Sequence, residues 1–249
     1  LWAWGSGGSG ILGLGNTNNH SVPTQVGHHS DWESIACSMT SHTIARKIDG
    51  SIWGWGNGSS AALGGSTLQA SLLPKKVGTD NFWTHISTGR HFSMARRSDG
   101  TLWVWGHGEG QPGTGPRALT LCNQTDEPWT QVTSGQGYNL ATRQDGSLWS
   151  WGNNSYGQLG IGNTTDQRTP VQVGTATNWQ KVVAGPTHTL GIRTDGTLWA
   201  WGYNIHSMLG NGTNTLRSSP TQIGSETSWI DIGAGVFHSL ALKRDGTLW

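Results

Sequence analysis

The chain has 249 residues and a formal net charge of +1, and only 12% of its residues are charged, although it contains 39 glycines and 16 tryptophans. Because Lys and Arg form no cluster, nothing in the charge pattern favours binding to nucleic acid or to an anionic membrane. No apolar run is long enough to span a membrane, so we expect no membrane insertion, and two cysteines are too few for a disulfide framework.

An Asp-Gly pair followed by Ser or Thr, then Leu or Ile, then Trp occurs five times, at intervals of 50 residues except for one of 46. Asp-Gly between two alternating runs is a strong hairpin signal, since both residues tolerate the positive φ of a tight turn. A fixed period of this length indicates a solenoid, a propeller or an array. We therefore expect a single propeller domain over 1–249, with repeats 1–50, 51–100, 101–146, 147–196 and 197–246, and with 247–249 beginning a further repeat.

The repeat 147–196 predicts four short strands. Residues 148–152 alternate as a strand and lead into a glycine-rich loop, and 170–174 contain a proline that an edge strand tolerates. Two core strands follow, at 179–185 and 188–193. Repeat 101–146 diverges, and we expect it to lack the Pro-containing strand. Both ends of the chain fall in phase in the same strand, so we expect that neither end supplies what the other lacks.

Two motifs carry a family resemblance. They are Trp-x-x-Val-x-x-Gly-x-x-His-x-Leu-x-x-Arg-x-Asp-Gly-x-Leu-Trp-x-Trp-Gly over 179–202 and Gly-Gln-Leu-Gly-x-Gly over 157–162. Both resemble the regulator of chromosome condensation repeat, and the resemblance covers the whole chain. It implies an all-β fold, a β-propeller of four-stranded antiparallel blades, with a family norm of seven blades and about 350 residues. Five repeats of about 50 residues are present here. We therefore expect one of three arrangements: the sequence is part of a longer protein, or five repeats close a smaller ring, or neighbouring chains complete the open strand ends.

The tryptophans recur at the same positions in each repeat, and we call such a set of equivalent positions a column. A residue that every repeat carries serves the repeat, so we expect these side chains to pack as a structural core rather than to bind a ligand. The predicted core consists of Trp53, Trp55, Trp83, Trp103, Trp105, Trp149, Trp151, Trp179, Trp199, Trp201 and Trp229.

Three other features have both a structural and a functional interpretation. His42, His188 and His238 share a column with Phe92 and Tyr138, which favours hydrogen-bonded structural histidines over a ring of metal ligands. Cys37 occupies a column of small residues, so we expect it to be buried and not bridged to Cys122. Six sequons fall in predicted loops, where a glycan would have room: Asn19, Asn57, Asn123, Asn153, Asn163 and Asn211.

The chain contains no nucleophile elbow, no phosphate-binding loop and no His-Glu-x-x-His motif. We therefore predict no catalytic, cofactor-binding or metal-binding residues, and hence neither an enzyme nor a cofactor. Light-sensing members of the family carry a Gly-Trp-Arg-His-Thr motif. The matching segments 89–93, 185–189 and 235–239 lack its Trp, so we do not expect photoreception.

Together these features favour a non-enzymatic binding or assembly scaffold. The sparsely charged, polar composition suits an extracellular or cell-surface location. The expected partner is a protein or a further copy of the chain, joined through open strand ends into a homo-oligomer or filament.

The resemblance leaves two alternatives. One is a guanine-nucleotide exchange factor for a small GTPase, although repeats of this length leave no room for an inserted wedge. The other is a protein inhibitor of an enzyme.

Overall fold

The computed structural model describes residues 1–38, 42–64, 69–107, 117–121 and 128–249. The chain divides into two compact units, Leu1–Thr125 (unit 1) and Asp126–Trp249 (unit 2). In the described ranges the strands form four four-stranded and two two-stranded sheets, and all of the pairings are antiparallel. The prediction of an all-β fold built from four-stranded antiparallel sheets is confirmed.

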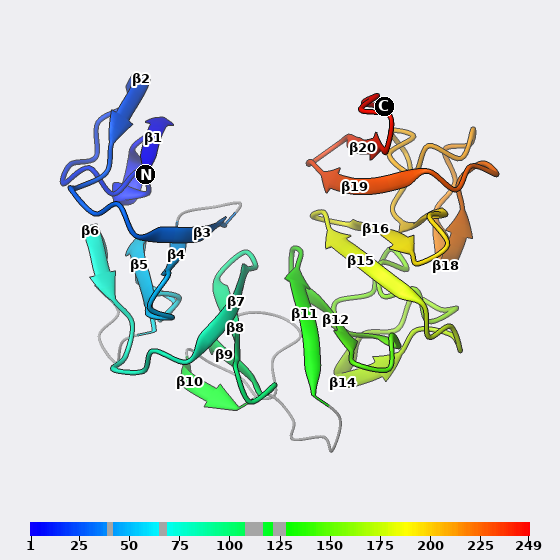
Figure 1. Cartoon of the computed structure of the whole chain (residues 1–249), viewed down its shortest axis with the longest axis horizontal. Helices are drawn as coiled ribbons and strands as arrows, with labels where there is room; N and C mark the ends of the chain where they lie inside the picture. Colours follow the sequence, from blue (N-terminus) through cyan, green and yellow to red (C-terminus); the bar gives the residue numbers. More distant parts are fainter. Residues whose placement is uncertain (39–41, 65–68, 108–116, 122–127) are drawn as a thin grey trace. The chain divides into compact units, whose positions relative to one another are not determined.

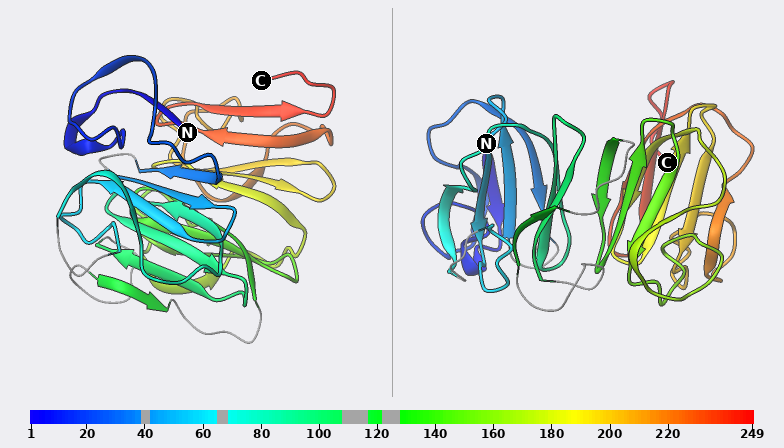
Figure 2. Two further views of the ribbon diagram at one scale, coloured as in Figure 1. Left: turned by 60° about the vertical axis from the view of Figure 1, so that its left-hand side comes forward. Right: turned by 90° about the horizontal axis from the view of Figure 1, so that it is seen from below.

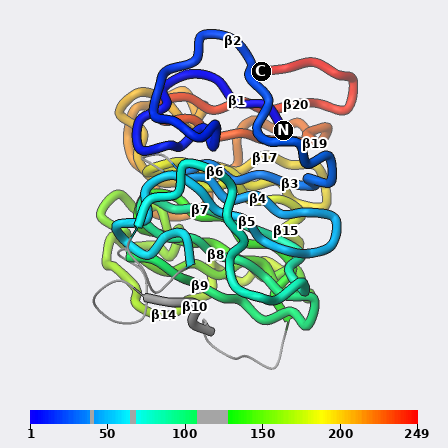
Figure 3. The backbone as a smooth tube through the Cα atoms, turned by 90° about the vertical axis from the view of Figure 1, so that its left-hand side faces the viewer, coloured from blue at the N-terminus to red at the C-terminus, as the bar shows by residue number. Residues whose placement is uncertain are grey.

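Unit 1 contains one two-stranded and two four-stranded sheets, which Figure 1 labels and Figure 3 traces in chain order. The two-stranded sheet pairs β1 (Trp2–Gly5) with β2 (His20–Gln25), and the short 3-10 helix η1 (Gly8–Gly10) lies between these strands in sequence. The four-stranded sheets comprise β3 (Trp32–Cys37), β4 (His42–Lys47), β5 (Ile52–Gly56) and β6 (Ser71–Lys76), then β7 (Trp83–Thr88), β8 (Phe92–Arg97), β9 (Leu102–Gly106) and β10 (Arg117–Leu121).

Unit 2 contains two four-stranded sheets and one two-stranded sheet, which stack in chain order (Figure 2). They comprise β11 (Trp129–Ser134), β12 (Tyr138–Arg143), β13 (Leu148–Gly152) and β14 (Gln167–Gln172), then β15 (Trp179–Ala184), β16 (His188–Arg193), β17 (Leu198–Gly202) and β18 (Arg217–Gln222), and finally β19 (Trp229–Ala234) with β20 (Ser239–Lys243). The Pro-containing strand β14 lies at a sheet edge, as predicted.

The Asp-Gly turn joins the second and third strands of each four-stranded sheet. Gly196 has φ +78°, a backbone conformation that costs glycine little. Asp195 Oδ1 accepts hydrogen bonds from the backbone N–H and the hydroxyl of Thr197, and the Thr197 hydroxyl in turn accepts one from Trp199 Nε1 at 2.8 Å. The same relay occurs at the Asp49, Asp99 and Asp245 turns, so Asp-Gly-Ser/Thr-x-Trp specifies one local structure.

A backbone carbonyl in the loop between the third and fourth strands of one sheet accepts two hydrogen bonds from the next sheet. We call it the shared carbonyl. The carbonyl oxygen of Gln158 accepts hydrogen bonds from Thr189 Oγ1 at 3.0 Å and from Trp201 Nε1 at 2.9 Å, both in the next sheet. A Cβ at Gly160 would lie 2.7 Å from Trp201 Nε1, which explains the Leu-Gly sequence of this loop. The carbonyls of Ile11 and Ala62 are shared in the same way, by Thr43 with Trp55 and by Ser93 with Trp105.

The predicted tryptophan core falls into two kinds of position. In the four Trp-x-Trp pairs of this core, the second Trp is fully buried and the first is half-buried beside the turn. The buried residues are Trp55, Trp105, Trp151 and Trp201, and the half-buried ones are Trp53, Trp103, Trp149 and Trp199. Trp83, Trp179 and Trp229 open the first strand of their sheets and are buried against hydrophobic clusters that extend from one sheet to the next.

Two sequence-based expectations were wrong. Repeat 101–146 does form a fourth strand, because β10 pairs with β9, and an edge strand needs only backbone groups rather than the Pro-x-Gln-Val pattern. Cys37 is exposed rather than buried, as is Ile35 on the same face of β3. A residue in the column of Cys37 is buried only where another sheet covers that face of the strand. Cys122 lies outside the described residues.

The indole bond to the shared carbonyl predicts a stability effect. Trp201→Phe keeps an aromatic ring but removes the N–H, so we expect the free energy of unfolding to fall by about 1 kcal/mol from the hydrogen bond, and further from the smaller ring. Urea unfolding followed by circular dichroism measures this change. The matched control is Trp2→Phe at an exposed position, and equal stability losses for the two variants would contradict the assignment.

Candidate functional site

The two-stranded sheets are the candidate site, because each is half of a four-stranded sheet. In sequence pattern β19 and β20 are first and second strands, whereas β1 and β2 are third and fourth strands. The pairing of Trp2 with Gln25 repeats that of Trp199 with Gln222. The expectation that neither end supplies what the other lacks is therefore wrong, because it was drawn from the position of the turn and not from the strand types.

Among the described residues, the outer edge of β20 is paired only at its C-terminal end, where residues 247–249 lie beside it and the Lys243 N–H bonds to the Thr247 carbonyl. Leu248 bridges to Leu242, and Trp249 exchanges two backbone hydrogen bonds of 2.9 Å with Ala241. In the sheet before it, Leu190 and Thr189 pair with Ala200 and Trp201 of the third strand. The pairings found for Leu240 and Ser239 join them to β19.

Side chains that other sheets bury are exposed at this edge. Leu240 is 45% exposed, whereas Leu190 in the same column is 3% exposed. Leu248 and Trp249 are exposed as well, and so are Val236 and Phe237 in the preceding loop. Unpaired strand edges with apolar side chains favour pairing with another strand.

A cavity of about 440 Å³ lies against β20, and its lining includes Met208, Trp229, Phe237 and Leu240. The Met208 carbonyl, in the loop between β17 and β18, is equivalent to the shared carbonyls of Ile11, Ala62 and Gln158. It accepts a hydrogen bond from Ser239 Oγ at 2.7 Å, and the described residues provide no indole N–H for it. In the complete sheets the equivalent carbonyl also binds the indole of a buried tryptophan on the third strand, such as Trp201.

The β1–β2 half-sheet presents the complementary surface. Trp4 is 58% exposed, whereas Trp201 in the same column is fully buried. A cavity of about 330 Å³ separates Trp4 from Ile35 and Cys37 of β3. In unit 2 the equivalent face of β15 packs against β11 and β12, the first two strands of the preceding sheet. The cavity in unit 1 lies where such first and second strands would pack.

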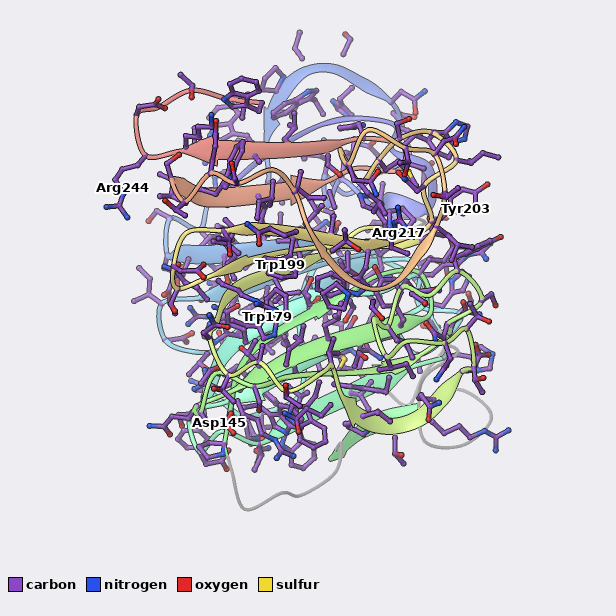
Figure 4. All side chains as sticks on the ribbon, turned by 90° about the vertical axis from the view of Figure 1, so that its right-hand side faces the viewer. Asp145, Trp179, Trp199, Tyr203, Arg217 and Arg244 are labelled. Atoms are coloured by element: carbon purple, nitrogen blue, oxygen red, sulfur yellow. The ribbon has the colours of Figure 1, made fainter. Side chains whose placement is uncertain are left out.

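A second repeated feature is the turn cluster, in which a basic side chain lies between two tryptophan rings beside the Asp-Gly turn. The guanidinium carbon of Arg193 lies 4.7 Å from the ring centre of Trp179 and 3.7 Å from that of Trp199. Figure 4 shows these two tryptophans side by side in unit 2. The other clusters are Lys47 with Trp32 and Trp53, Arg97 with Trp83 and Trp103, Arg143 with Trp129 and Trp149, and Lys243 with Trp229 and Trp249.

The histidine column links neighbouring sheets by hydrogen bonds, as the sequence favoured. Nε2 of His42 lies 3.0 Å from Ser93 Oγ, and Nε2 of His188 lies 3.0 Å from Ser239 Oγ. Burial lowers the pKa of each of these two histidines to about 4. His91 and His238 contribute by repelling a second positive charge. Both imidazoles are therefore neutral at pH 7.

The sequons differ in accessibility. Asn19 and Asn163 are exposed in loops, and Asn57 and Asn153 are half-buried in loops. Nδ2 of Asn211, the atom that a glycan would modify, is buried, so modification there requires the loop to open. Asn123 lies outside the described residues.

In the ranges that the structure covers, no group of three or more His, Cys, Asp or Glu residues is arranged to hold a metal ion. None of the helical turns described could span a lipid bilayer.

Comparisons with known proteins agree with this architecture. Over 185 residues the chain is 28% identical to the Arabidopsis thaliana ultraviolet-B receptor UVR8, covering 69% of this chain and 41% of the receptor. Human WBSCR16 superposes with a TM-score of 0.86 at 20% identity, covering 98% of this chain and 67% of that chain. Prp20p from Saccharomyces cerevisiae, whose structure was reported with its binding to Gsp1p and histones, gives a TM-score of 0.82 at 21% identity, covering 96% of this chain and 63% of that chain.

The four-stranded sheets and their propeller neighbours define a repeat protein of the β-propeller class. The RCC1-like domain model matches residues 1–249, and the chain belongs to this family. The chain spans less than half of the length of UVR8. An RCC1-like propeller supports a protein-interaction role.

Sequence reasoning missed two features of the site. The complementarity of the half-sheets could have been recognised by beginning each repeat at the Trp of its first strand, as the sheets do, instead of at the turn. The turn cluster could have been recognised from the Lys or Arg that always stands two residues before Asp-Gly.

The buried histidines predict a pH effect on stability. The unfolded chain takes up these protons near pH 6.5 and the folded chain only near pH 4, so the stabilisation is complete above pH 6.5 and is lost as the pH falls towards 4. Each histidine contributes at most about 1.4 kcal/mol per pH unit. Urea unfolding between pH 4 and 7 should show this slope, and His188→Gln should reduce it. An unchanged slope in the variant would contradict the assignment.

Proposed function

We propose that the chain is a non-enzymatic protein-binding scaffold that associates with copies of itself through its half-sheets. The supporting observation is the exposed apolar edge of β20, together with the complementary strand types of β1 and β2. In this arrangement β1–β2 of one copy completes β19–β20 of the next. The resulting sheet has four strands, like the other sheets of the fold.

The register of the complete sheets specifies how the half-sheets would join. Thr189 pairs with Trp201, so an incoming β1 places Trp4 opposite Ser239 and brings its indole N–H to the Met208 carbonyl. Trp2 then takes the place of Trp249 opposite Ala241. Displacement of Trp249 breaks its two hydrogen bonds to Ala241 and its ring contacts with Lys243 and Trp229, which Trp2 would replace, and it uncovers little surface because Trp249 is largely exposed.

The contact uses a different surface on each copy. A head-to-tail interface of this kind forms a ring if its rotation closes and a filament if it does not. The low net charge of the chain opposes such association only weakly.

We also propose an extracellular or cell-surface location, which is supported by the polar composition and by the exposed sequons Asn19 and Asn163. Mass spectrometry of the protein from its native source tests this location, since unmodified asparagines in protein recovered only from cytosol would contradict it.

The exchange-factor and inhibitor alternatives stay predictions from the resemblance. Release of labelled nucleotide from a panel of small GTPases would decide in favour of the former.

The self-association predicts a molar mass above 26.6 kDa that rises with concentration in light scattering. Leu240→Glu should give a monomer, because it places a carboxylate at the open edge. Ile230→Glu is the matched control, because Ile230 on β19 is 44% exposed and should leave association unchanged.

Mixing two defective variants sharpens the test. Trp4→Ser impairs the β1 surface and Leu240→Glu the β20 surface, so each variant alone should be monomeric. Their equimolar mixture should form a dimer and stop there, since each copy retains one intact surface. A wild-type chain that stays at 26.6 kDa at every concentration would contradict the proposal.

A further inference from the structure

The turn clusters differ in how their cation is neutralised. Lys47 Nζ lies 3.1 Å from Asp31 Oδ1, and Arg97 and Lys243 form ion pairs with Asp80 and Glu226. All three acids come from the segment that immediately precedes the first strand of the sheet. Each acid is half-exposed or exposed, so its carboxylate lies on the solvent side of the cation.

The Arg193 cluster lacks this carboxylate. Asp80 and Glu226 stand three residues before Trp83 and Trp229, and the corresponding residue before Trp179 is Ala176. Within the described ranges, Arg193 has no ion pair. Arg143 does not permit the same comparison, because the segment before Trp129 lies partly outside the described residues.

The local charge around Arg193 is incompletely compensated. Burial lowers the pKa of Arg193, and the carboxylate of Asp195 opposes this shift only in part. Asp195 Oδ1 is already engaged by the backbone and hydroxyl of Thr197 in the turn. Nε of Arg193 is buried without a hydrogen-bond partner among the described residues, but so are Nε of Arg97 and of Arg143, so the missing ion pair is what distinguishes Arg193 from Arg97.

The cluster holds the guanidinium against two aromatic rings. The rings of Trp179 and Trp199 are 6.2 Å apart and inclined at 74° to each other, so they contact Arg193 from two roughly perpendicular sides and not from opposite faces. A guanidinium held in this way loses little side-chain freedom when its remaining N–H groups donate to a carboxylate.

We propose that Arg193, Trp179 and Trp199 form a binding site for an Asp or Glu side chain of a partner protein. The ligand class is taken from the three clusters in which the chain itself supplies a carboxylate. The bound acid would occupy the position that Glu226 takes beside Lys243. This site is independent of the half-sheets, so its test does not depend on self-association.

A peptide copied from the chain tests the site. The probe is the capped tetrapeptide Ser-Glu-Thr-Ser, the sequence of residues 225–228, observed by saturation-transfer-difference NMR with the complete protein. We expect saturable binding that is roughly tenfold weaker for Ser-Gln-Thr-Ser, because a charge-assisted hydrogen-bond pair is replaced by neutral ones. Equal affinity for the two peptides would overturn the proposal.

Two pairs of variants keep the test decisive. Ala176→Glu should block peptide binding by supplying the carboxylate within the chain, and the matched Ala176→Gln should not. Arg193→Lys should weaken binding, and Arg193→Met should abolish it if the variant folds. Undiminished peptide binding by Ala176→Glu would overturn the proposal, whatever the stability of the Arg193 variants.

Discussion

A single backbone carbonyl, shared by a hydroxyl and an indole of the next sheet, is the interaction on which the rest of this structure depends. The Gln158 oxygen holds Thr189 on a second strand and Trp201 on a third, so one acceptor fixes two strands of the neighbouring sheet. Because the acceptor lies in a loop, the Leu-Gly sequence of that loop is as necessary as the tryptophan, and Gly160 contacts the indole directly. The repeat is therefore defined by contacts between sheets as much as by the hairpin within each sheet.

The half-sheets differ from the complete sheets in this same interaction. At β20 the Met208 carbonyl holds Ser239 but no indole, and the column that buries Leu190 leaves Leu240 exposed. The turn clusters show the same principle on a smaller scale. Comparison of equivalent positions identifies two differences among the described residues: the Met208 carbonyl has no indole partner, and Arg193 has no ion pair.

The sequence predicted those parts of the fold that depend on local pattern. The Asp-Gly turns, the four strands of a sheet and the edge position of β14 follow from turn chemistry, alternation and proline. Features that depend on what covers a surface could not be predicted in this way. Cys37 shares a column with partly or fully buried residues but is exposed beside a cavity, and β10 forms without the expected proline. The acids of the turn clusters were also hard to recognise, because Asp31 stands one residue before its tryptophan and Asp80 three.

The most direct measurement of the central claim is hydrogen–deuterium exchange of the β20 amides as a function of protein concentration. If β20 acquires a third strand from another copy, the amide of Ser239 should become protected as the concentration rises, because it faces the same edge as the amide of Ala241, which already bonds to Trp249. Its protection should then approach that of Thr189 in β16, which already has a strand on each side. A Ser239 amide that exchanges equally fast at every concentration, while that of Thr189 stays protected, would contradict the account.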